Sequence, residues 1–255
     1  MLRSFKQRTS NGGDSPGTVG LLFFYRFLFA EYLNENHLVF HGFPLILTAM
    51  KTFTAKGEKA RQRLLETAIK LFAEKGFSGT SLDEIVNAAA INKRMIYHYF
   101  GNKEKLYQNV LLAEYSKLEI LEIKTLNMDD PIEIVVGDIV ATYFSFLQSN
   151  PEFVQLILWE NLNRGRSLDT MQVQLSKSPM MEFLIKVVHE GKENGTIRPE
   201  IDSRFLLISL IGNCMIYYSN RYTLSLALGI DLADPGVLNR AKKTVADLIL
   251  NGIKA

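Results

Sequence analysis

The sequence has very little cysteine. Cys214 is the only cysteine among 255 residues, which excludes an intrachain disulfide framework and a zinc site built from several cysteines. A lone cysteine within an apolar run is typical of a small core residue. We therefore expect Cys214 to be buried, and the lack of disulfides favours a reducing, cytoplasmic location.

The short motifs of common enzyme classes are also missing. There is no His-Glu-x-x-His, no Gly-x-Ser-x-Gly and no Gly-x-x-x-x-Gly-Lys-Ser/Thr segment. The four histidines, at positions 37, 41, 98 and 189, do not form a cluster in the sequence. These absences predict that the protein is not an enzyme and that it carries no metal and no cofactor.

Residues 1–49 lack an apolar run of the roughly 20 residues that span a bilayer. The apolar run at residues 21–30 is about half that length, and Arg26 interrupts it. Three interpretations stay open: translation that starts at Met50, an additional helix or membrane-associated arm, and a signal peptide. We favour the start at Met50, so membrane association through residues 18–47 is not the expected outcome.

The rest of the chain lacks the alternation of apolar and polar residues that marks β-strands. Apolar residues recur instead at helical spacing, which predicts an all-α protein. The predicted helices cover residues 57–75, 81–90, 93–99, 103–123, 131–149, 152–161, 178–193, 202–228 and 235–253.

Charge is distributed unevenly along the chain. Residues 50–120 hold 12 Lys/Arg and 8 Asp/Glu, a net charge of +4, whereas residues 121–255 hold 13 and 16, a net charge of −3. The basic excess of the middle segment suits contact with a polyanion. We therefore predict a domain at residues 50–120, a second domain at residues 121–255 and an atypical extension at residues 1–49.

Residues 81–100 match the requirements of a helix-turn-helix. Ser81 and Glu84 form a capping-box pattern at the start of the first helix. The second helix is short and begins with the polar residues Asn92, Lys93 and Arg94, and the N-terminal residues of such a helix reach base edges in DNA. The positions expected to pack the two helices together are Ile85, Ala89, Ile91, Ile96 and Tyr99.

At these residues the chain resembles the TetR family of transcriptional regulators. The resemblance rests on Gly76-Phe77-x-x-Thr80-Ser81-Leu82, on Ala89-x-Ile91-x-Lys93-x-x-Ile96-Tyr97-x-Tyr99-Phe100, and on Asn102-Lys103-Glu104-x-Leu106. The chain departs from the family pattern at Ala90, at Asn92 and at Arg94. Arg94 adds a charge near the DNA, so the operator sequence cannot be carried over from a relative.

The resemblance and the residue types together assign roles in DNA binding. Thr80, Ser81 and Lys103 are expected at phosphates, and Asn92 at the start of the second helix. Lys93 and Arg94 are the candidates for base edges. Tyr97 and His98 should touch DNA one turn further on. Three basic residues of the preceding arm should add nonspecific affinity: Lys56, Lys59 and Arg61.

For residues 121–255 the resemblance implies an all-helical domain that binds a small-molecule effector and forms a homodimer, with residues 202–228 and 235–253 as the pairing helices. The dimer should bind a near-palindromic double-stranded operator and release it when the effector binds. Repression is the usual sign in this family, and activation stays open. Six polar or aromatic residues could line the effector pocket, although core packing is the competing interpretation for each: Tyr143, Gln155, Trp159, Asn213, Tyr217 and Asn220.

Overall fold

The structure, a computed structural model, describes residues 54–127, 130–168 and 178–255. The expectations for residues 1–49 lie outside these ranges. The described residues form helices and no β-strand, so the all-α prediction is confirmed. In chain order the helices are α3 (Ala55–Gly79), α4 (Leu82–Ala89), α5 (Arg94–Tyr99), α6 (Lys103–Thr125), α7 (Ile132–Ser149), α8 (Pro151–Leu162), α10 (Pro179–Glu193), α11 (Ser203–Ser219), α12 (Arg221–Leu228) and α13 (Pro235–Ile253).

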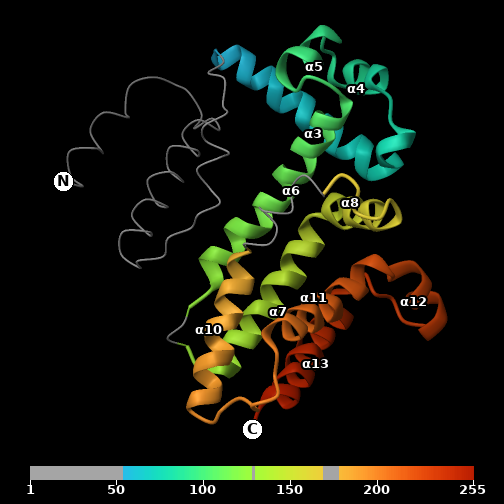
Figure 1. Ribbon diagram of the computed structural model, residues 1–255. Coiled ribbons are helices and arrows are strands. Elements are labelled where there is room, and N and C mark those ends of the chain that lie inside the picture. Colours follow the sequence, from blue (N-terminus) through green and yellow to red (C-terminus); the bar gives the residue numbers. More distant parts are fainter. Residues whose placement is uncertain (1–53, 128–129, 169–177) are drawn as a thin grey trace, which may run out of the picture. The chain divides into compact units, whose positions relative to one another are not determined.

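Helices α3, α4 and α5 surround one hydrophobic core together with the first half of α6 (Figure 1). The largest fully buried side chains of this core include Phe72, Ile85, Ile96 and Tyr107. Phe72 and Tyr107 meet edge to face with ring centroids 4.9 Å apart, a favoured aromatic geometry. This small unit carries the helix-turn-helix at the upper end of Figure 1.

Local sequence signals set the helix ends here. Ser81 accepts the N–H of Glu84 while the Glu84 carboxylate accepts the N–H of Ser81, which completes the predicted capping box. Asn102 caps α6 by accepting the N–H of Lys105 at 2.8 Å. Gly76 has φ +70°, a left-handed value that interrupts α3 at the position predicted for a terminating glycine.

A second hydrophobic core lies among α6, α7, α8, α10, α11 and α13. α7 is central to it, with eight buried residues and contacts to α6, α8, α11 and α13. Among the described residues, α7 is also the one helix long and apolar enough to cross a membrane, but these contacts mark it as a core helix. Cys214 is fully buried in the same core, as predicted.

α6 links the two cores without a break. Its Leu106 and Leu111 belong to the helix-turn-helix core, while its Leu118 and Leu121 pack against the second core. The domain division expected at residues 120 and 121 therefore falls inside a continuous helix.

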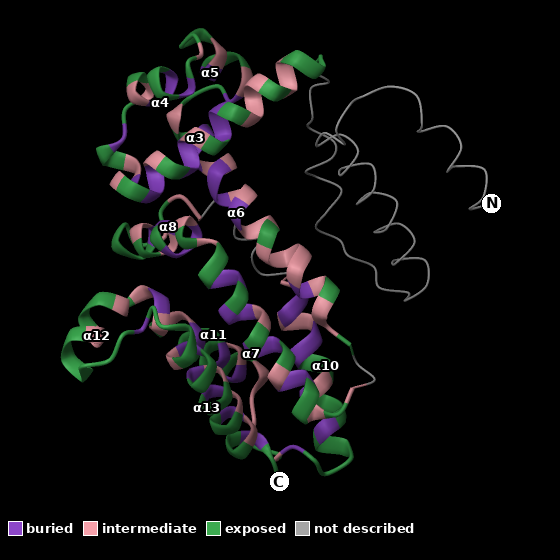
Figure 2. Ribbon diagram, turned by 180° about the vertical axis from the view of Figure 1, so that it is seen from behind, coloured by how far each residue is buried: buried purple, intermediate pink, exposed green. Residues whose placement is uncertain are grey.

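The prediction of one continuous helix at residues 202–228 is wrong, because the structure has two helices there. The backbone leaves the helical range at Asn220, with φ −109° and ψ 17°, and the chain continues as the separate helix α12. The Asn220 side chain accepts the Ser219 hydroxyl at 2.7 Å, a local bond that competes with helix continuation. As a result α12 projects away from the bundle, and its residues are largely exposed (Figures 1 and 2).

Candidate nucleic-acid interface

The turn between α4 and α5 has the geometry of a helix-turn-helix. Ile85, Ala89 and Ile96 are at most 2% exposed and join the two helices. Ala90 lies in the left-handed region, with φ 51° and ψ 48°, where glycine would be unstrained. Arg63 of α3 donates to the Ala90 carbonyl at 3.4 Å and so supports this turn, a contact that the sequence did not predict.

The start of α5 exposes three of the predicted DNA-binding residues, Asn92, Lys93 and Arg94. The Asn92 side chain accepts the N–H of Arg94 at 2.9 Å, so the helix begins at Arg94, one residue later than predicted. Tyr97, which is 54% exposed, and His98 follow Arg94 by three and four residues. Because that spacing places them on one helix face, Arg94, Tyr97 and His98 form one exposed surface.

Lys93 is paired with an acidic side chain. Its ammonium lies 2.8 Å from a carboxylate oxygen of Asp83, which is in the first turn of α4. The hydrogen bond to Asp83 raises the pKa of Lys93, so the lysine stays charged. A Lys93 contact to DNA therefore has to compete with Asp83.

The structure does not support the predicted phosphate contact of the Thr80 hydroxyl. Its side chain is 1% exposed, and its hydroxyl donates to the carbonyls of Gly76 at 2.9 Å and Leu71 at 3.0 Å. A hydroxyl engaged in this way cannot reach a phosphate. Thr80 instead fixes the loop between α3 and α4.

Ser81 is exposed, but its backbone N–H is already bound by Glu84 at 2.8 Å. That backbone bond, together with Lys75, lowers the pKa of Glu84 to about 2, so the carboxylate is ionised at neutral pH. The Glu84 carboxylate therefore occupies the Ser81 N–H at the start of α4, while the Ser81 hydroxyl can still act as a donor to a phosphate.

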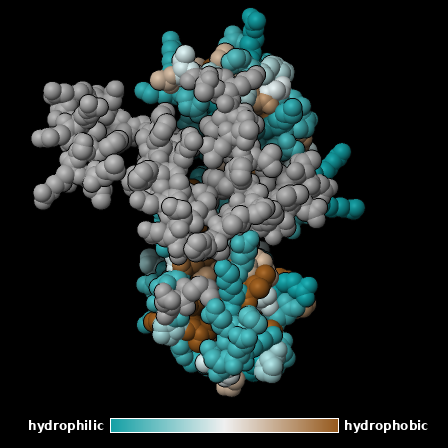
Figure 3. All heavy atoms as spheres, turned by 60° about the vertical axis from the view of Figure 1, so that its left-hand side comes forward, coloured by the Kyte–Doolittle hydropathy of each residue, from teal (hydrophilic) through white to brown (hydrophobic). Residues whose placement is uncertain are grey.

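The remaining basic candidates for DNA binding differ in the contacts that their side chains make within the protein. The Lys103 ammonium lies 4.4 Å from the centre of the Phe77 ring, a cation–π contact. Arg61 is paired with Glu58 at 3.2 Å and lies over Phe100. Lys56 and Lys59 of the arm are exposed. The visible atoms at the upper end of Figure 3, at the height of this domain, are largely hydrophilic.

The six residues predicted to line an effector pocket do not come together. Gln155, Asn213 and Asn220 are exposed, whereas Tyr143 is 4% exposed and donates to Glu122 at 2.6 Å. Tyr217 packs on the Phe144 ring, which agrees with the competing core interpretation. Trp159 faces α3, where its indole N–H donates to the Ala73 carbonyl at 3.0 Å.

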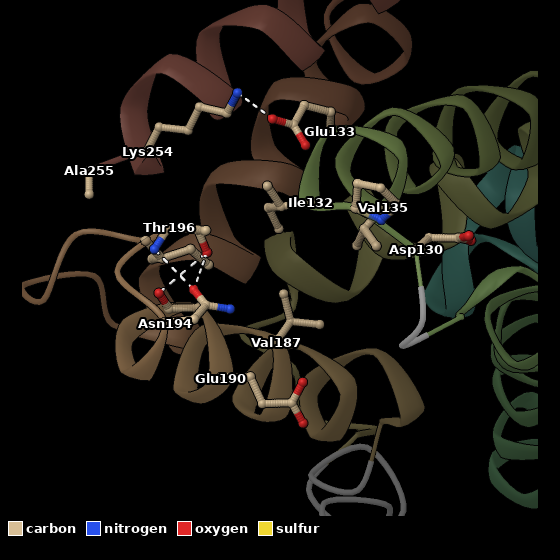
Figure 4. Close-up of a pocket in the computed structure, with 13 residues that line it drawn as sticks. Asp130, Ile132, Glu133, Val135, Val187, Glu190, Asn194, Thr196, Lys254 and Ala255 are labelled. Atoms are coloured by element: carbon tan, nitrogen blue, oxygen red, sulfur yellow. Dashed lines mark hydrogen bonds and ion pairs between the residues drawn. The ribbon is translucent and has the colours of Figure 1, made fainter.

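A cavity of about 470 Å³ lies elsewhere, between the start of α7 and the end of α10 (Figure 4). Ile132, Val135 and Val187 form its apolar wall, and Asn194 and Thr196 lie at one side. Lys254 and Glu133 form an ion pair at its edge. None of the six predicted residues lines this cavity.

The sequence analysis also missed three buried carboxylates, Glu114, Glu122 and Glu160, each at most 3% exposed. Burial raises the pKa of Glu122 to about 7, although the Tyr143 hydroxyl bonds it. Glu160 accepts the N–H of Ser167 at 3.2 Å and so holds the loop after α8. Their signal in the sequence is weak, since glutamates are common on helices and most of them are exposed.

A short helix with an exposed basic start, held on a second helix by a tight turn, defines a helix-turn-helix DNA-binding protein. Comparison with known proteins then identifies the family. The family "Bacterial regulatory proteins, tetR family" matches residues 64–110. "Tetracyclin repressor-like, C-terminal domain" matches residues 134–249.

Related proteins and solved structures are consistent with this family. The HTH-type transcriptional repressor NicS of Pseudomonas putida is 31% identical over 201 residues, which are 78% of this chain and 94% of that protein. The HTH-type transcriptional repressor SCO4008 of Streptomyces coelicolor is 27% identical over 159 residues, or 60% and 77% of the two chains. A TetR transcriptional regulator from Chloroflexus aurantiacus has the same fold, with a TM-score of 0.61, 21% identity and 79% and 99% of the two chains covered. FadR of Bacillus subtilis, solved in complex with stearoyl-CoA, has a TM-score of 0.57 at 18% identity, with 76% and 99% covered.

The chain belongs to the TetR family and is a DNA-binding transcriptional regulator, not an enzyme.

Proposed function

We propose that this protein represses transcription as a homodimer that binds a near-palindromic operator through α5. The exposed surface of Arg94, Tyr97 and His98 is the observation that carries the proposal. An arginine can donate two hydrogen bonds to guanine O6 and N7, which makes Arg94 the main candidate for sequence recognition. Lys93, Asn92, Ser81 and Lys103 then contact the backbone or neighbouring bases around it.

The dimer is supported by exposed apolar side chains on α11, α12 and α13. Phe205, Ile208 and Ile216 are 68%, 64% and 45% exposed, and their spacing places them on one face of α11. Gly212 lies on the same face with open space around it, which would let a second helix approach closely. Leu226 of α12 and Leu248 of α13 are 86% and 62% exposed. We call these five apolar residues the C-terminal apolar face.

We further propose that a small-molecule effector binds the C-terminal domain and weakens operator binding. The cavity at the start of α7 falls within the usual size range of ligand sites, roughly 300–1,000 Å³. The solved FadR of Bacillus subtilis was in complex with stearoyl-CoA, so this fold can hold a small molecule. Linkage between the two sites then requires that the effector favours a DNA-free arrangement. A thermal-shift screen of metabolites, followed by anisotropy of the operator complex, tests this part.

The DNA-binding proposal is tested by fluorescence anisotropy on fragments that flank the protein's own gene. We expect one near-palindromic fragment to bind with a Kd on the order of 10⁻⁸ M or below, with strong salt dependence. Arg94→Ala should weaken that complex by about 10- to 100-fold and weaken nonspecific duplexes less. Arg204→Ala, which removes an exposed arginine on α11, is the matched control. Equal, weak binding to every fragment would contradict the proposal.

A further inference from the structure

α8 contributes buried side chains to both hydrophobic cores. Its Phe153 packs edge to face against Tyr115 of α6 and Phe146 of α7, with ring centroids 5.4 Å and 5.0 Å apart. One turn on, Leu156 is fully buried in the helix-turn-helix core. Trp159 follows about 9 Å further along the axis than Phe153. α8 is therefore anchored in the C-terminal domain at its start and in the DNA-binding domain at its end.

Trp159 contacts α3 at the glycine that interrupts it. A Cβ atom on Gly76 would lie 2.8 Å from Cδ2 and 2.9 Å from Cε3 of the indole, closer than real Cβ contacts. The indole N–H also donates to the Ala73 carbonyl, three residues before the interruption. Because Gly76 has no side chain and has a positive φ, the indole can pack directly against the backbone of α3 at this point.

The same point of α3 positions the helix-turn-helix. The Gly76 carbonyl accepts the Thr80 hydroxyl, and Thr80 directly precedes Ser81, which caps α4. Lys75, on the other side of Gly76, is paired with Glu84 of α4 at 2.9 Å. A displacement of the indole would thus act directly on the segment that places α4 and, through the turn, α5.

α6 alone cannot fix the orientation of the DNA-binding domain. A single helix joins the two domains along one line, so it constrains the angle between them less than two separate attachments do. A second attachment away from that line is needed to define the angle, and the contact between Trp159 and Gly76 supplies it.

We propose that Trp159 is a positioning residue that fixes the angle of the helix-turn-helix on the C-terminal domain and so sets the half-site spacing that a dimer accepts. The inference rests on the proposed function, in which two copies bind half-sites about one DNA turn, or roughly 34 Å, apart. A rigid contact makes the dimer selective for one spacing. Without the contact, each α5 can adjust to neighbouring spacings.

The probe is the duplex that the wild-type protein selects from a random pool, together with derivatives that carry one or two additional central base pairs. The variants are Trp159→Leu, which removes the ring and the N–H, and Trp159→Phe, which removes the N–H but keeps a ring on Gly76. Leu162→Ala is the control, because Leu162 is 74% exposed on the same helix. Thermal melting of each variant checks that it is folded.

We expect Trp159→Leu to reduce the preference for the selected spacing by about tenfold, Trp159→Phe by about threefold, and Leu162→Ala not at all. A general loss of stability would weaken all duplexes equally and leave this preference unchanged. Trp159 is the only tryptophan in the chain, so the tryptophan emission of the protein comes from this residue alone. A change in emission when the wild-type protein binds the altered duplex reports that the indole has moved away from Gly76.

Gly76→Ala supplies an independent check. In the wild-type background its methyl group would lie 2.8 Å from the indole, whereas Trp159→Leu removes that ring; the strain of the positive φ is common to both backgrounds. The melting temperature should therefore fall less in the double variant than the two single changes would add up to. Identical spacing preferences for wild type and both folded Trp159 variants would overturn the inference. If the wild-type protein selected no duplex, the proposed function itself would fail, and this inference with it.

Discussion

Helices α5 and α12 are both short and both leave most of their side chains outside a core, yet they expose different chemistry. α5 buries only Ile96 and exposes Arg94, Tyr97 and His98. α12 buries no residue and exposes Tyr222 and Leu226 at 81% and 86%. Water solvates the polar surface of α5 well, whereas each exposed apolar side chain of α12 loses the transfer free energy that burial would provide. The comparison teaches that α5 suits a hydrated polyanion and α12 suits an apolar partner such as a second copy.

The largest expected effect concerns the C-terminal apolar face. Phe205→Glu would place a charge where the second copy is expected to cover an apolar ring, and we expect dimerisation to weaken by more than about 100-fold. Sedimentation velocity should then show monomers at micromolar concentration.

Leu162→Glu is the matched control for Phe205→Glu. Leu162 is a similarly exposed apolar residue on α8, outside the C-terminal apolar face. Loss of the dimer in both variants, or in neither, would contradict the role proposed for the C-terminal apolar face.

The second prediction compares the two interiors. Thr80 is a neutral polar side chain buried beside the helix-turn-helix core, whereas Glu122 is an ionisable side chain buried in the C-terminal domain. Burial raises the pKa of Glu122 from 4.5 to about 7, while Tyr143, Ser178 and the Met180 backbone N–H oppose this rise and Glu119 adds to it. The folded state then binds more protons than the unfolded state between about pH 4.5 and pH 7, so this carboxyl makes stability fall as pH rises through that window.

Glu122→Gln should remove this part of the pH dependence. The variant cannot ionise, so its free energy of unfolding should exceed that of wild type at pH 8 by on the order of 2 kcal/mol, with little difference at pH 4.5. Urea unfolding at several pH values measures both quantities. A wild-type difference between pH 5 and pH 8 that Glu122→Gln leaves intact would show that other groups are responsible.

The third prediction separates a structural residue from a contact residue within the DNA-binding domain. Thr80→Val keeps the shape but leaves the Gly76 and Leu71 carbonyls without the hydroxyl, so stability should fall by about 1–3 kcal/mol. The salt dependence of DNA binding should stay unchanged.

Lys103→Ala is the counterpart of Thr80→Val. It should reduce the slope of log K against log salt by about 1, because one phosphate contact is lost. If Thr80→Val reduced the slope instead, the structural role given to Thr80 would be wrong.

The smallest expected effect concerns the exposed pair of Lys93 and Asp83. Asp83→Asn should free the ammonium for DNA, and operator affinity should rise about two- to fivefold at low salt. Asp247→Asn on α13 removes the same charge far from α4 and serves as the control. Equal gains in both variants would mean that net charge alone is responsible.

Sequence alone predicted the DNA-binding domain well because its signals are local. Ser81 with Glu84, Asn102 and Gly76 each act within four residues, so their caps and turns could be recognised without knowing the fold. The hydroxyl of Thr80 is occupied by the carbonyls of Gly76 and Leu71, and no local pattern shows that the loop after α3 folds back onto Leu71. The six predicted pocket residues do not line the cavity at the start of α7, because the position of a cavity depends on contacts between distant helices. The partner of Trp159 is 86 residues distant, and no periodicity in α8 indicates which domain its indole faces.

The brevity of α12 has a consequence for the lifetime of the protein in a cell. An isolated helix of eight residues is marginal in water, and α12 buries none of its residues. It contacts α11, and its Ser225 hydroxyl accepts the N–H of Leu232 in the loop that follows. A segment of this kind opens easily in a lone subunit, and proteases cleave such transiently opened segments. We therefore expect newly made subunits that find no second copy to be degraded first, so that the cell's pool of regulator consists of assembled, operator-competent molecules.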